Sequence, residues 1–347
     1  MRACGGITLA VLCLSVGASP AGANTVFDLG SFVPTSISGG QAVGGGILDP
    51  LNDAAPPHAG VWVKGTLTRL AEPAGTTASE VSGLNMDGRV SGAVEGTGGV
   101  HAVSWDSPTD PVSHQLGPLA SLPADYSTTG GVDNAGRVVG TTLETGVRTT
   151  GFLAAPGGGL AQVGTFERGP GSSSAVGVTP DGSRLLGRVG GSADSGAADG
   201  WYLWPAAGAA GAKLSITPVV HGSFILGGAI STLYANNLAS DGTVLGYKDG
   251  ASRSYWLRLP DGSETPVAGL AGHNAVNARH VVAGSIATTD KDGNPFPHAA
   301  IWKPDGTVVD LNTLLPTGSG LVLAAALAIN DNGDIAGIAI NTTGQVG

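Results

Sequence analysis

Cysteine is nearly absent from this chain of 347 residues, which contains only Cys4 and Cys13. Both lie within residues 1–23, which have the features of a cleavable leader, so the exported chain would begin near Asn24 and contain no cysteine. This excludes disulfides and thiol chemistry from the mature protein. Export without disulfides is typical of a bacterial protein of the periplasm or the extracellular space, and unlike a small disulfide-stapled domain.

Long hydrophobic runs are also missing. The leader has Arg2 at its positive end, a short apolar core at Ile7–Val16 and a small-residue cleavage site at 21–23. Its core is too short to remain as a membrane anchor, and no later stretch reaches the roughly 18 apolar residues of a spanning helix. We therefore predict a signal peptide at 1–23, a single domain at 24–347, no integral membrane segment in the mature chain, and a secreted or periplasmic location.

Charged residues are scarce, and positive charge is scarcest. Only 12% of the residues are charged, and 16 basic residues stand against 26 acidic ones, for a formal net charge of −10. The basic residues form no stripe or cluster, which argues against nucleic acid and anionic membranes as partners. The net charge also disfavours an anionic glycan. A protein, a neutral glycan or a cation-bearing molecule is a better candidate ligand.

Helical periodicity is absent after the leader, whereas glycine is abundant, at 59 residues. The glycines are not scattered: a unit that ends in a short hydrophobic strand and a Gly is written seven times, at a mean step of about 49 residues, which points to a repeat architecture. The copies are GGQAVG (39–44), LNMDGRVSG (84–92), VDNAGRVVG (132–140), VTPDGSRLLG (178–187), LASDGTVLG (238–246), NARHVVAG (277–284) and INDNGDIAG (329–337). Their closing glycines are Gly44, Gly92, Gly140, Gly187, Gly246, Gly284 and Gly337.

Each full unit contains four short strands joined as consecutive hairpins. The first turn is Asp-Gly or a relative in most copies, for example Asp87-Gly88, because these residues adopt the backbone conformations of tight turns. The third strand ends in a large aromatic residue suited to fill the wedge between neighbouring sheets. These residues are Trp62, Trp105, Trp204, Trp256 and Trp302, with Ala154 in the third unit.

Four strands per unit at this period predict an all-β fold, a seven-bladed β-propeller of four-stranded antiparallel blades. The segment TVFDL (25–29) matches TVVDL (307–311), the last strand of the sixth unit. We therefore expect the N-terminal strand to join the C-terminal unit and close the ring, with a thin or incomplete closing blade. A linear β-solenoid is the competing architecture.

The signature I-N-x-x-G-x-V-x-G, followed by a His-Ala-aromatic-x-Trp strand, resembles the HAF-repeat family of exported bacterial proteins. The best copies are INDNGDIAG (329–337) and HAAIWKPDG (298–306), and the resemblance covers roughly 25–347. It implies export and repeated β units. It brings no activity and no catalytic residues.

A metal site has one weak candidate. Asp290, Asp292 and Asn294 alternate as in a calcium loop, but the Gly and Glu positions of a full EF-hand loop are not matched. The alternative is a polar hairpin loop without an ion. The histidines show no zinc spacing, and we expect no cofactor other than this calcium.

Most acidic residues occupy turns, so we assign no catalytic residue and expect a ligand-binding or scaffold module. The alternative is a hydrolase or lyase acting on extracellular polysaccharide, which would need two converging carboxylates. Candidates outside the turns are Glu80, Glu95, Glu144, Glu167 and Asp199. A ligand would be sought first in the longest loops, which are Leu48–Pro57, Gly190–Asp199 and Thr288–Pro297.

Overall fold

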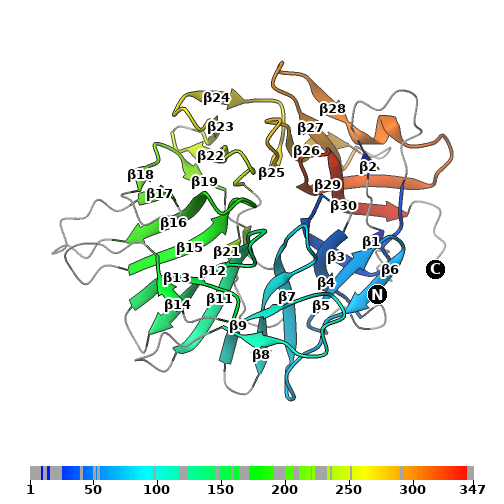
Figure 1. Cartoon of the computed structure of the whole chain (residues 1–347). Coiled ribbons are helices and arrows are strands. Elements are labelled where there is room, and N and C mark those ends of the chain that lie inside the picture. The colour runs from blue at the N-terminus through cyan, green and yellow to red at the C-terminus, as the bar shows by residue number, and fades with distance from the viewer. Residues whose placement is uncertain are drawn as a thin grey trace.

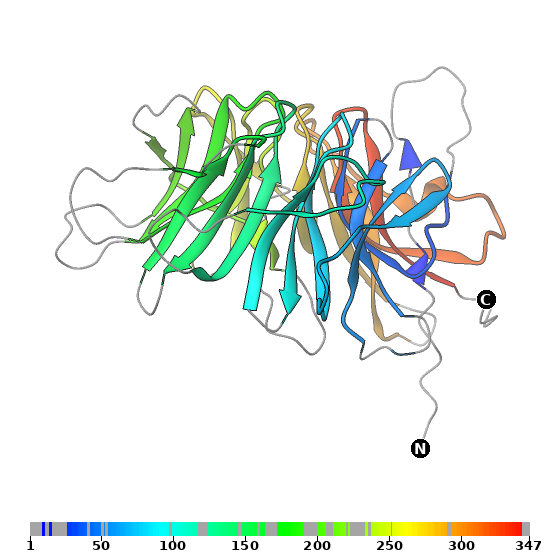
Figure 2. The ribbon, with the colours of Figure 1, turned by 60° about the horizontal axis from the view of Figure 1, so that its bottom comes forward.

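The computed structural model is an all-β protein whose antiparallel sheets follow one another around a ring, as in a β-propeller (Figure 1). Figure 2 shows the same sheets side by side around that ring. The structure describes residues 9–10, 14–15, 26–39, 42–49, 52, 55–96, 99–116, 124–144, 148–157, 160–163, 172–190, 200–205, 211–219, 221–222, 233–234, 237–250, 252–289 and 293–341. Within these ranges no helix is long and apolar enough to cross a membrane; a short 3-10 turn, η1 (Leu311–Leu314), is the one helical element described.

Four sheets are separate four-stranded meanders, as expected for a blade. The first contains β3 (Phe32–Ile37), β4 (Ala42–Ile47), β5 (His58–Val63) and β6 (Thr66–Arg69). The second contains β15 (Ser172–Val178), β16 (Arg184–Gly190), β17 (Gly200–Pro205) and β18 (Ala212–Lys213). The third contains β19 (Thr217–Pro218), β22 (Val244–Lys248), β23 (Ser254–Arg258) and β24 (Glu264–Val267). The fourth contains β25 (Gly272–Val276), β26 (Val282–Thr289), β27 (Pro295–Trp302) and β28 (Val308–Asp310).

A fifth sheet has eight strands, where the sequence predicts two blades of four. Its strands are β7 (Ala78–Leu84), β8 (Val90–Gly96), β9 (Gly99–Trp105), β10 (His114–Gln115), β11 (Ala124–Val132), β12 (Val138–Glu144), β13 (Arg148–Ala154) and β14 (Leu160–Gln162). Each half is a meander in chain order, and the halves merge because Tyr126 of β11 pairs in parallel with Val100 of β9. Strand pairing therefore yields four separate blades and not the seven expected.

The sheet that closes the ring is built differently from the expectation. It contains β29 (Leu321–Ile329), β30 (Asp334–Asn341) and two short strands of the N-terminal region, β1 (Leu9–Ala10) and β2 (Leu14–Ser15). Both short strands pair with β30 in a single antiparallel register, on the edge opposite β29. The N-terminal region thus joins the C-terminal sheet, but through residues of the predicted leader.

The segment expected to close the ring, residues 25–29, is not a strand where it is described. It reaches the closing sheet through side chains: Val26 packs on the cluster that contains Leu323, and Leu29 packs with Ala336. The similarity of 25–29 to 307–311 therefore reflects residues that pack on the core in the same way. It does not reflect an equivalent strand in a sheet.

We name the units after the sequence repeat. Unit one is β3–β6, unit two β7–β10, unit three β11–β14, unit four β15–β18, unit five β19 with β22–β24, unit six β25–β28, and unit seven β29–β30. Unit five also carries the two-stranded pair β20 (His221–Gly222) and β21 (Leu233–Tyr234), and β21 contacts β11 and β15.

The closing glycine of each unit is explained by a close approach within the sheet. A Cβ on Gly92 would lie 2.0 Å from the carbonyl oxygen of Glu80, and one on Gly187 would lie 2.1 Å from that of Ser174, so only glycine fits. A β-bulge follows the residue that pairs with each of these glycines. In unit one the equivalent residue is Gly45, because a Cβ on Gly45 would lie 2.1 Å from Val33 O. The prediction of Gly44 was therefore wrong by one residue.

The repeated tryptophans pack between neighbouring sheets, with one exception. Trp62, Trp105, Trp204 and Trp302 are all buried. In unit five the pairing of Trp256 with Gly246 places it two residues earlier than the other tryptophans, and Arg258 takes their position opposite Val244. The alignment of Trp256 with the others was therefore wrong by two residues.

The Asn of the repeat signature joins neighbouring units. The Nδ2 group of Asn85 donates to Asp133 O at 2.8 Å, that of Asn277 to Asn330 O at 2.9 Å, and that of Asn330 to Ser38 O at 2.9 Å. Each acceptor occupies the equivalent position of the next unit, so one side chain fixes the spacing of two sheets. We call this contact the Asn latch. The units without this Asn are units one, three, four and five, which have Ser38, Asp133, Thr179 and Ala239 at this position.

Candidate functional site

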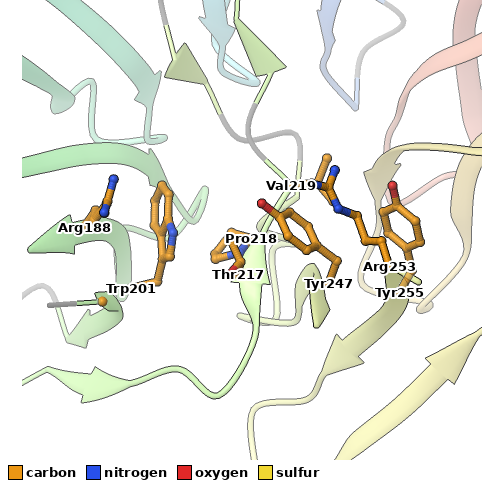
Figure 3. Close-up of a pocket in the computed structure, with 9 residues that line it drawn as sticks. Arg188, Trp201, Thr217, Pro218, Val219, Tyr247, Arg253 and Tyr255 are labelled. Carbon is orange, nitrogen blue, oxygen red and sulfur yellow. The ribbon is translucent and has the colours of Figure 1, made fainter. Parts of the chain in front are cut away.

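A pocket of about 580 Å³ opens beside units four and five (Figure 3). Strands β16 and β17 contribute Arg188 and Trp201, and strands β22 and β23 contribute Tyr247 and Tyr255. The remaining lining residues are Gly200, Thr217, Pro218, Val219 and Arg253. Aromatic rings and guanidinium groups therefore make up most of its chemistry.

The four strand residues occupy one repeated position. In every unit with a third strand, the residue after the closing glycine pairs with a residue of that strand. These pairs are small in four units: Gly46 with Ala59, Ala93 with Ala102, Thr141 with Gly151, and Ser285 with Ala299. In units four and five they are Arg188 with Trp201 and Tyr247 with Tyr255. Two adjacent units therefore depart from the repeat at the same place, and there the pocket lies.

The first strand of unit five, which borders the pocket, is short. Strand β19 has 2 residues, whereas the described first strands of the other units have between 5 and 9. Thr217 pairs with Tyr247 and Pro218 with Gly246, and Val219 N donates to Leu245 O beyond them. Thr217, Pro218 and Val219 line the pocket, so this short segment forms part of its wall beside Tyr247.

Tyr255 is held from behind by a histidine of unit six. The rings of Tyr255 and His273 stack with centroids 3.6 Å apart and an interplanar angle of 9°. His273 is 5% exposed, and neither ring nitrogen has a hydrogen-bond partner among the described residues. Burial lowers the pKa of His273 to about 4, so the ring is neutral near pH 7 and stacks without a charge.

Arg253 holds Tyr247 from the other side. Its guanidinium carbon lies 4.1 Å from the centroid of the Tyr247 ring, a cation–π contact, and its Nε lies 3.6 Å from Asp249 Oδ1. The pKa of Arg253 is raised above its ordinary value. The largest contribution comes from a hydrogen bond with the side chain of Tyr255, and Tyr247 and Asp249 contribute less. Tyr247 and Tyr255 meet edge to face, with centroids 6.2 Å apart. The aromatic wall is therefore fixed before any ligand arrives.

Figure 3 places Arg188 beside Trp201 at one end of the pocket, and Arg253 with the two tyrosines toward the other. No aspartate or glutamate is among the lining residues. Such a site can stack a ring on aromatic faces and donate hydrogen bonds to hydroxyl or anionic groups. It offers no carboxylate as a general acid or base.

A second cavity, of about 540 Å³, lies at the central opening where the signature turns meet. Its carboxylates are Asp181 and Asp331, both turn residues, and Asp331 accepts a hydrogen bond from Ser240. Of the carboxylates proposed for a hydrolase or lyase, neither Glu80 nor Glu95 lines this opening. The side chain of Glu144 and all of Glu167 and Asp199 lie outside the described residues. The two described members of that set, Glu80 and Glu95, therefore do not converge at this opening.

The ligand loops predicted from the sequence are described only in part. Loop Gly190–Asp199 connects β16 to β17, the strands that carry Arg188 and Trp201, but 191–199 fall outside the description. In the calcium candidate, Asp290 and Asp292 are likewise outside it, and Asn294 directly precedes β27. The structure adds one group with metal-binding atoms within 4.8 Å of one another, formed by Asp106, Asp110 and His114, although Arg89 pairs with Asp106 at 2.7 Å.

Two histidines that occupy equivalent positions in third strands, His58 and His298, are paired within their own sheets. His58 Nδ1 lies 2.9 Å from Glu72 Oε1, and His298 Nδ1 lies 2.7 Å from Asp310 Oδ2. Each carboxylate follows or ends the fourth strand of the same unit. These contacts connect the third strand to the outer edge of the sheet, which is a structural role.

Sequence reasoning missed the pocket because it looked for function in loops. A signal was present: Trp201 is the one tryptophan that the sequence pattern does not assign to the repeat. Arg188 and Tyr247 also follow closing glycines where other units have small residues or, in unit seven, Ile338.

No protein-family model matches this chain, and no curated protein does. Solved structures do match. The β-propeller domain of the Trilobed protease from Pyrococcus furiosus has a TM-score of 0.52 at 12% identity, covering 85% of this chain and 88% of that one. A gluconolactonase from Xanthomonas campestris has a TM-score of 0.38 at 12% identity, covering 98% of both chains. The BP39L lectin from Burkholderia pseudomallei has a TM-score of 0.40 at 12% identity, covering 94% of this chain and 88% of that one.

At these identities the likeness shows the fold alone. The match to the Pyrococcus domain supports a β-propeller, and the two scores below 0.5 carry no further argument.

Proposed function

We propose that this chain is an exported β-propeller protein that binds a carbohydrate ligand in the pocket beside units four and five. The observation that carries the proposal is the pair of bulky cross-strand pairs, Arg188 with Trp201 and Tyr247 with Tyr255, where the other paired positions are small. Flat aromatic faces with adjacent hydrogen-bond donors suit a sugar ring, which has an apolar face and a polar rim.

The propeller we propose has seven blades. The eight-stranded sheet contributes two of them, units two and three, because each half is a complete meander and a single residue pair joins the halves. Units one, four, five and six contribute four, and β29–β30 contribute the closing blade. Export is supported by the leader-like residues 1–23 and by the resemblance to HAF repeats.

A glycan panel with the full chain tests the binding proposal. We expect at least one oligosaccharide to raise the melting temperature, because a ligand that binds only the folded state stabilises it. Trp201→Ala should abolish that shift. Phe296→Ala, which removes an aromatic side chain of β27 outside the pocket, should retain it. If no glycan shifts the melting temperature and the chain self-associates with concentration, a structural role replaces the binding role.

A further inference from the structure

We propose that the outer edge of β30 binds an extended peptide segment of a partner protein once residues 1–23 have been removed. In this arrangement the partner strand takes the place that the third strand has in units one to six, and its tryptophan packs beside Gly337. The proposal rests on the predicted leader and on strand pairing, and it is independent of the pocket beside units four and five.

Strands β1 and β2 pair with β30 in the register of a third strand. In units one, two and six, the residue two positions before the closing glycine pairs with the tryptophan of the third strand, and the residue two positions after it pairs with the histidine. In unit seven these residues are Ile335 and Ala339, which pair with Leu14 and Ala10. Both sets of partners are four residues apart in the chain and run antiparallel to the second strand. Residues of the predicted leader therefore occupy the third-strand place of unit seven.

The boundary between units six and seven has the walls of a tryptophan site. Trp105 of unit two is buried in a cluster with residues of units one and two, among them Ala59, Leu70, Val81 and Val90. By strand pairing, their equivalents are Ala299, Leu311, Ala326 and Ile335. All four equivalents line an apolar cavity of about 10 Å³, together with Gly337. Part of the place that an indole fills in unit two is therefore unfilled here.

Gly337 corresponds to the glycine that lies against the tryptophan in other units. A Cβ on Gly92 would lie 3.1 Å from Cζ3 of Trp105, and one on Gly187 would lie 2.7 Å from Cζ3 of Trp204. The glycine thus leaves room for an indole ring in two units. At Gly337 the same close packing favours a partner strand with a tryptophan opposite Ile335.

The backbone groups of an edge strand supply the affinity. Strand β29 pairs with one edge of β30, and β1 and β2 pair with the other. Removal of residues 1–23 therefore takes away the strands that pair with the backbone N–H and C=O groups of this second edge. An added strand pairs with such groups, and side-chain pockets give the preference for its sequence. The segment that fits has the third-strand pattern of this chain, as in HAVSW (101–105) and HAAIW (298–302).

Binding is measured by fluorescence anisotropy with a labelled peptide that has the sequence of residues 295–304, PFPHAAIWKP. The peptide is titrated with the full chain and with the processed chain recovered after export. We expect the processed chain to bind the peptide at least ten-fold more tightly, because β1 and β2 cover the edge in the full chain. Replacing the tryptophan of the peptide by alanine should weaken this binding ten-fold, and a scrambled peptide should not bind.

The full chain provides a second test that does not depend on export. Ala10→Pro combined with Leu14→Pro should expose the edge, because proline has no backbone N–H for strand pairing. This variant should bind the peptide as the processed chain does. Ala18→Pro is the matched control, since position 18 lies outside β1 and β2, and it should bind no more peptide than the full chain. Melting curves establish that each variant is folded.

Disulfide formation tests the register of the partner strand. Residues 24–347 contain no cysteine, so Ala339→Cys gives the processed chain a single thiol opposite the histidine position of the third strand. A peptide with cysteine in place of its histidine should form a disulfide with this thiol. A peptide with cysteine at the next position should not, because neighbouring residues of a strand point to opposite faces.

Four results would overturn the edge site. The first two are equal binding of the peptide by the full and processed chains, and no binding by the processed chain. An exported chain that retains residues 1–23 is the third, since the edge is then never vacated. The fourth is self-association of the processed chain with which the peptide does not compete, because the occupant is then a second copy. None of these results changes the glycan test, which concerns a different part of the molecule.

Discussion

Units four and five contrast with units six and seven. Between units six and seven, Ala299 packs against Leu311 and Leu323, and the Asn latch from Asn277 to Asn330 joins the two turns. In units four and five the equivalents of Ala299 are Trp201 and Tyr255, and the latch position holds Thr179 and Ala239. One region is closed by small residues and an amide contact, and the other is open and lacks both.

The contrast shows how a repeat can acquire a site. Small residues let neighbouring sheets approach, while the latch keeps their turns in step. Where both are replaced in adjacent units, aromatic and charged side chains gain room without disturbing the glycines and bulges that define each sheet. The predictions below test this contrast, beginning with the largest expected effect.

Ala299→Trp places a tryptophan, the residue that unit four has as Trp201, at the packed boundary between units six and seven. Ala299 is 2% exposed, so an indole there has no space, and we expect a loss of about 3 kcal/mol or more in the free energy of unfolding, or failure to fold. Denaturant unfolding measures it. Trp201→Ala, which removes a half-buried ring at the equivalent position, should cost only about 1–2 kcal/mol. Equal, small losses would show that the closed boundary has room and that the contrast is wrong.

Asn277→Ala breaks one latch. The side chain is 2% exposed, donates to Asn330 O, and accepts from the backbone N–H groups of Arg279 and Val281. Leaving these groups buried and unpaired should cost about 2–3 kcal/mol. Asn332→Ala is the control: its Nδ2 donates to Gly39 O at 2.9 Å from an exposed position, and its loss should be about 0.5 kcal/mol. Similar losses from the two substitutions would remove the energetic role of the latch.

His273 should make the open region sensitive to acid. Its folded pKa of about 4 lies below the ordinary 6.5, so the unfolded chain binds a proton that the folded chain does not between these values. Its contribution is therefore full above pH 6.5 and is lost as the pH falls toward 4, by roughly 2–3 kcal/mol. His273→Phe keeps a stacked ring without titration, so its unfolding free energy should decline less over this range. If the unfolding free energies of wild type and His273→Phe declined in parallel with pH, the imidazole of His273 would not be buried and neutral as described.

Glu80 in β7 should show the opposite sign. It is 3% exposed, and burial raises the pKa of its carboxyl well above the ordinary value, so the folded chain keeps a proton that the unfolded chain releases. Stability from this group is full below pH 4.5 and is lost as the pH rises. Near pH 5 Glu80→Gln should differ from wild type by less than about 1 kcal/mol, because both side chains are neutral. The variant should gain relative stability toward pH 8, and a constant difference would contradict this.

Much of the fold can be predicted from positions where steric limits allow only one residue type. The close approach at Gly92 and the turn conformation of Gly88, with φ +86°, leave no choice of residue, so the sequence shows them directly. Register is harder, since neighbouring residues of similar type satisfy a pattern equally well. Gly44 was therefore chosen where Gly45 makes the contact, and Trp256 was aligned two residues away from its true equivalent. The prediction that residues 25–29 form the closing strand was wrong for the same reason, because their similarity to 307–311 does not fix where they lie.

The site was less predictable than the fold. A search for loops and for paired carboxylates passes over Tyr247 and Tyr255, because an aromatic residue in a strand is ordinary. Their meaning emerges only from strand pairing, which places Tyr247 and Arg188 at one repeated position. The stacking of His273 on Tyr255 connects two units and has no local sequence signal.

The latch from Asn330 to Ser38 has a consequence for the order of folding. It joins residues 292 positions apart, whereas each sheet forms mostly from hairpins of near neighbours. Closing so long a loop costs entropy that local hairpins avoid, and chains rich in distant contacts fold slowly. The individual meanders should thus assemble first and the Asn330–Ser38 contact last. Protection of the side-chain amide of Asn330, which donates to Ser38 O, would then mark the moment at which an open row of sheets becomes a ring.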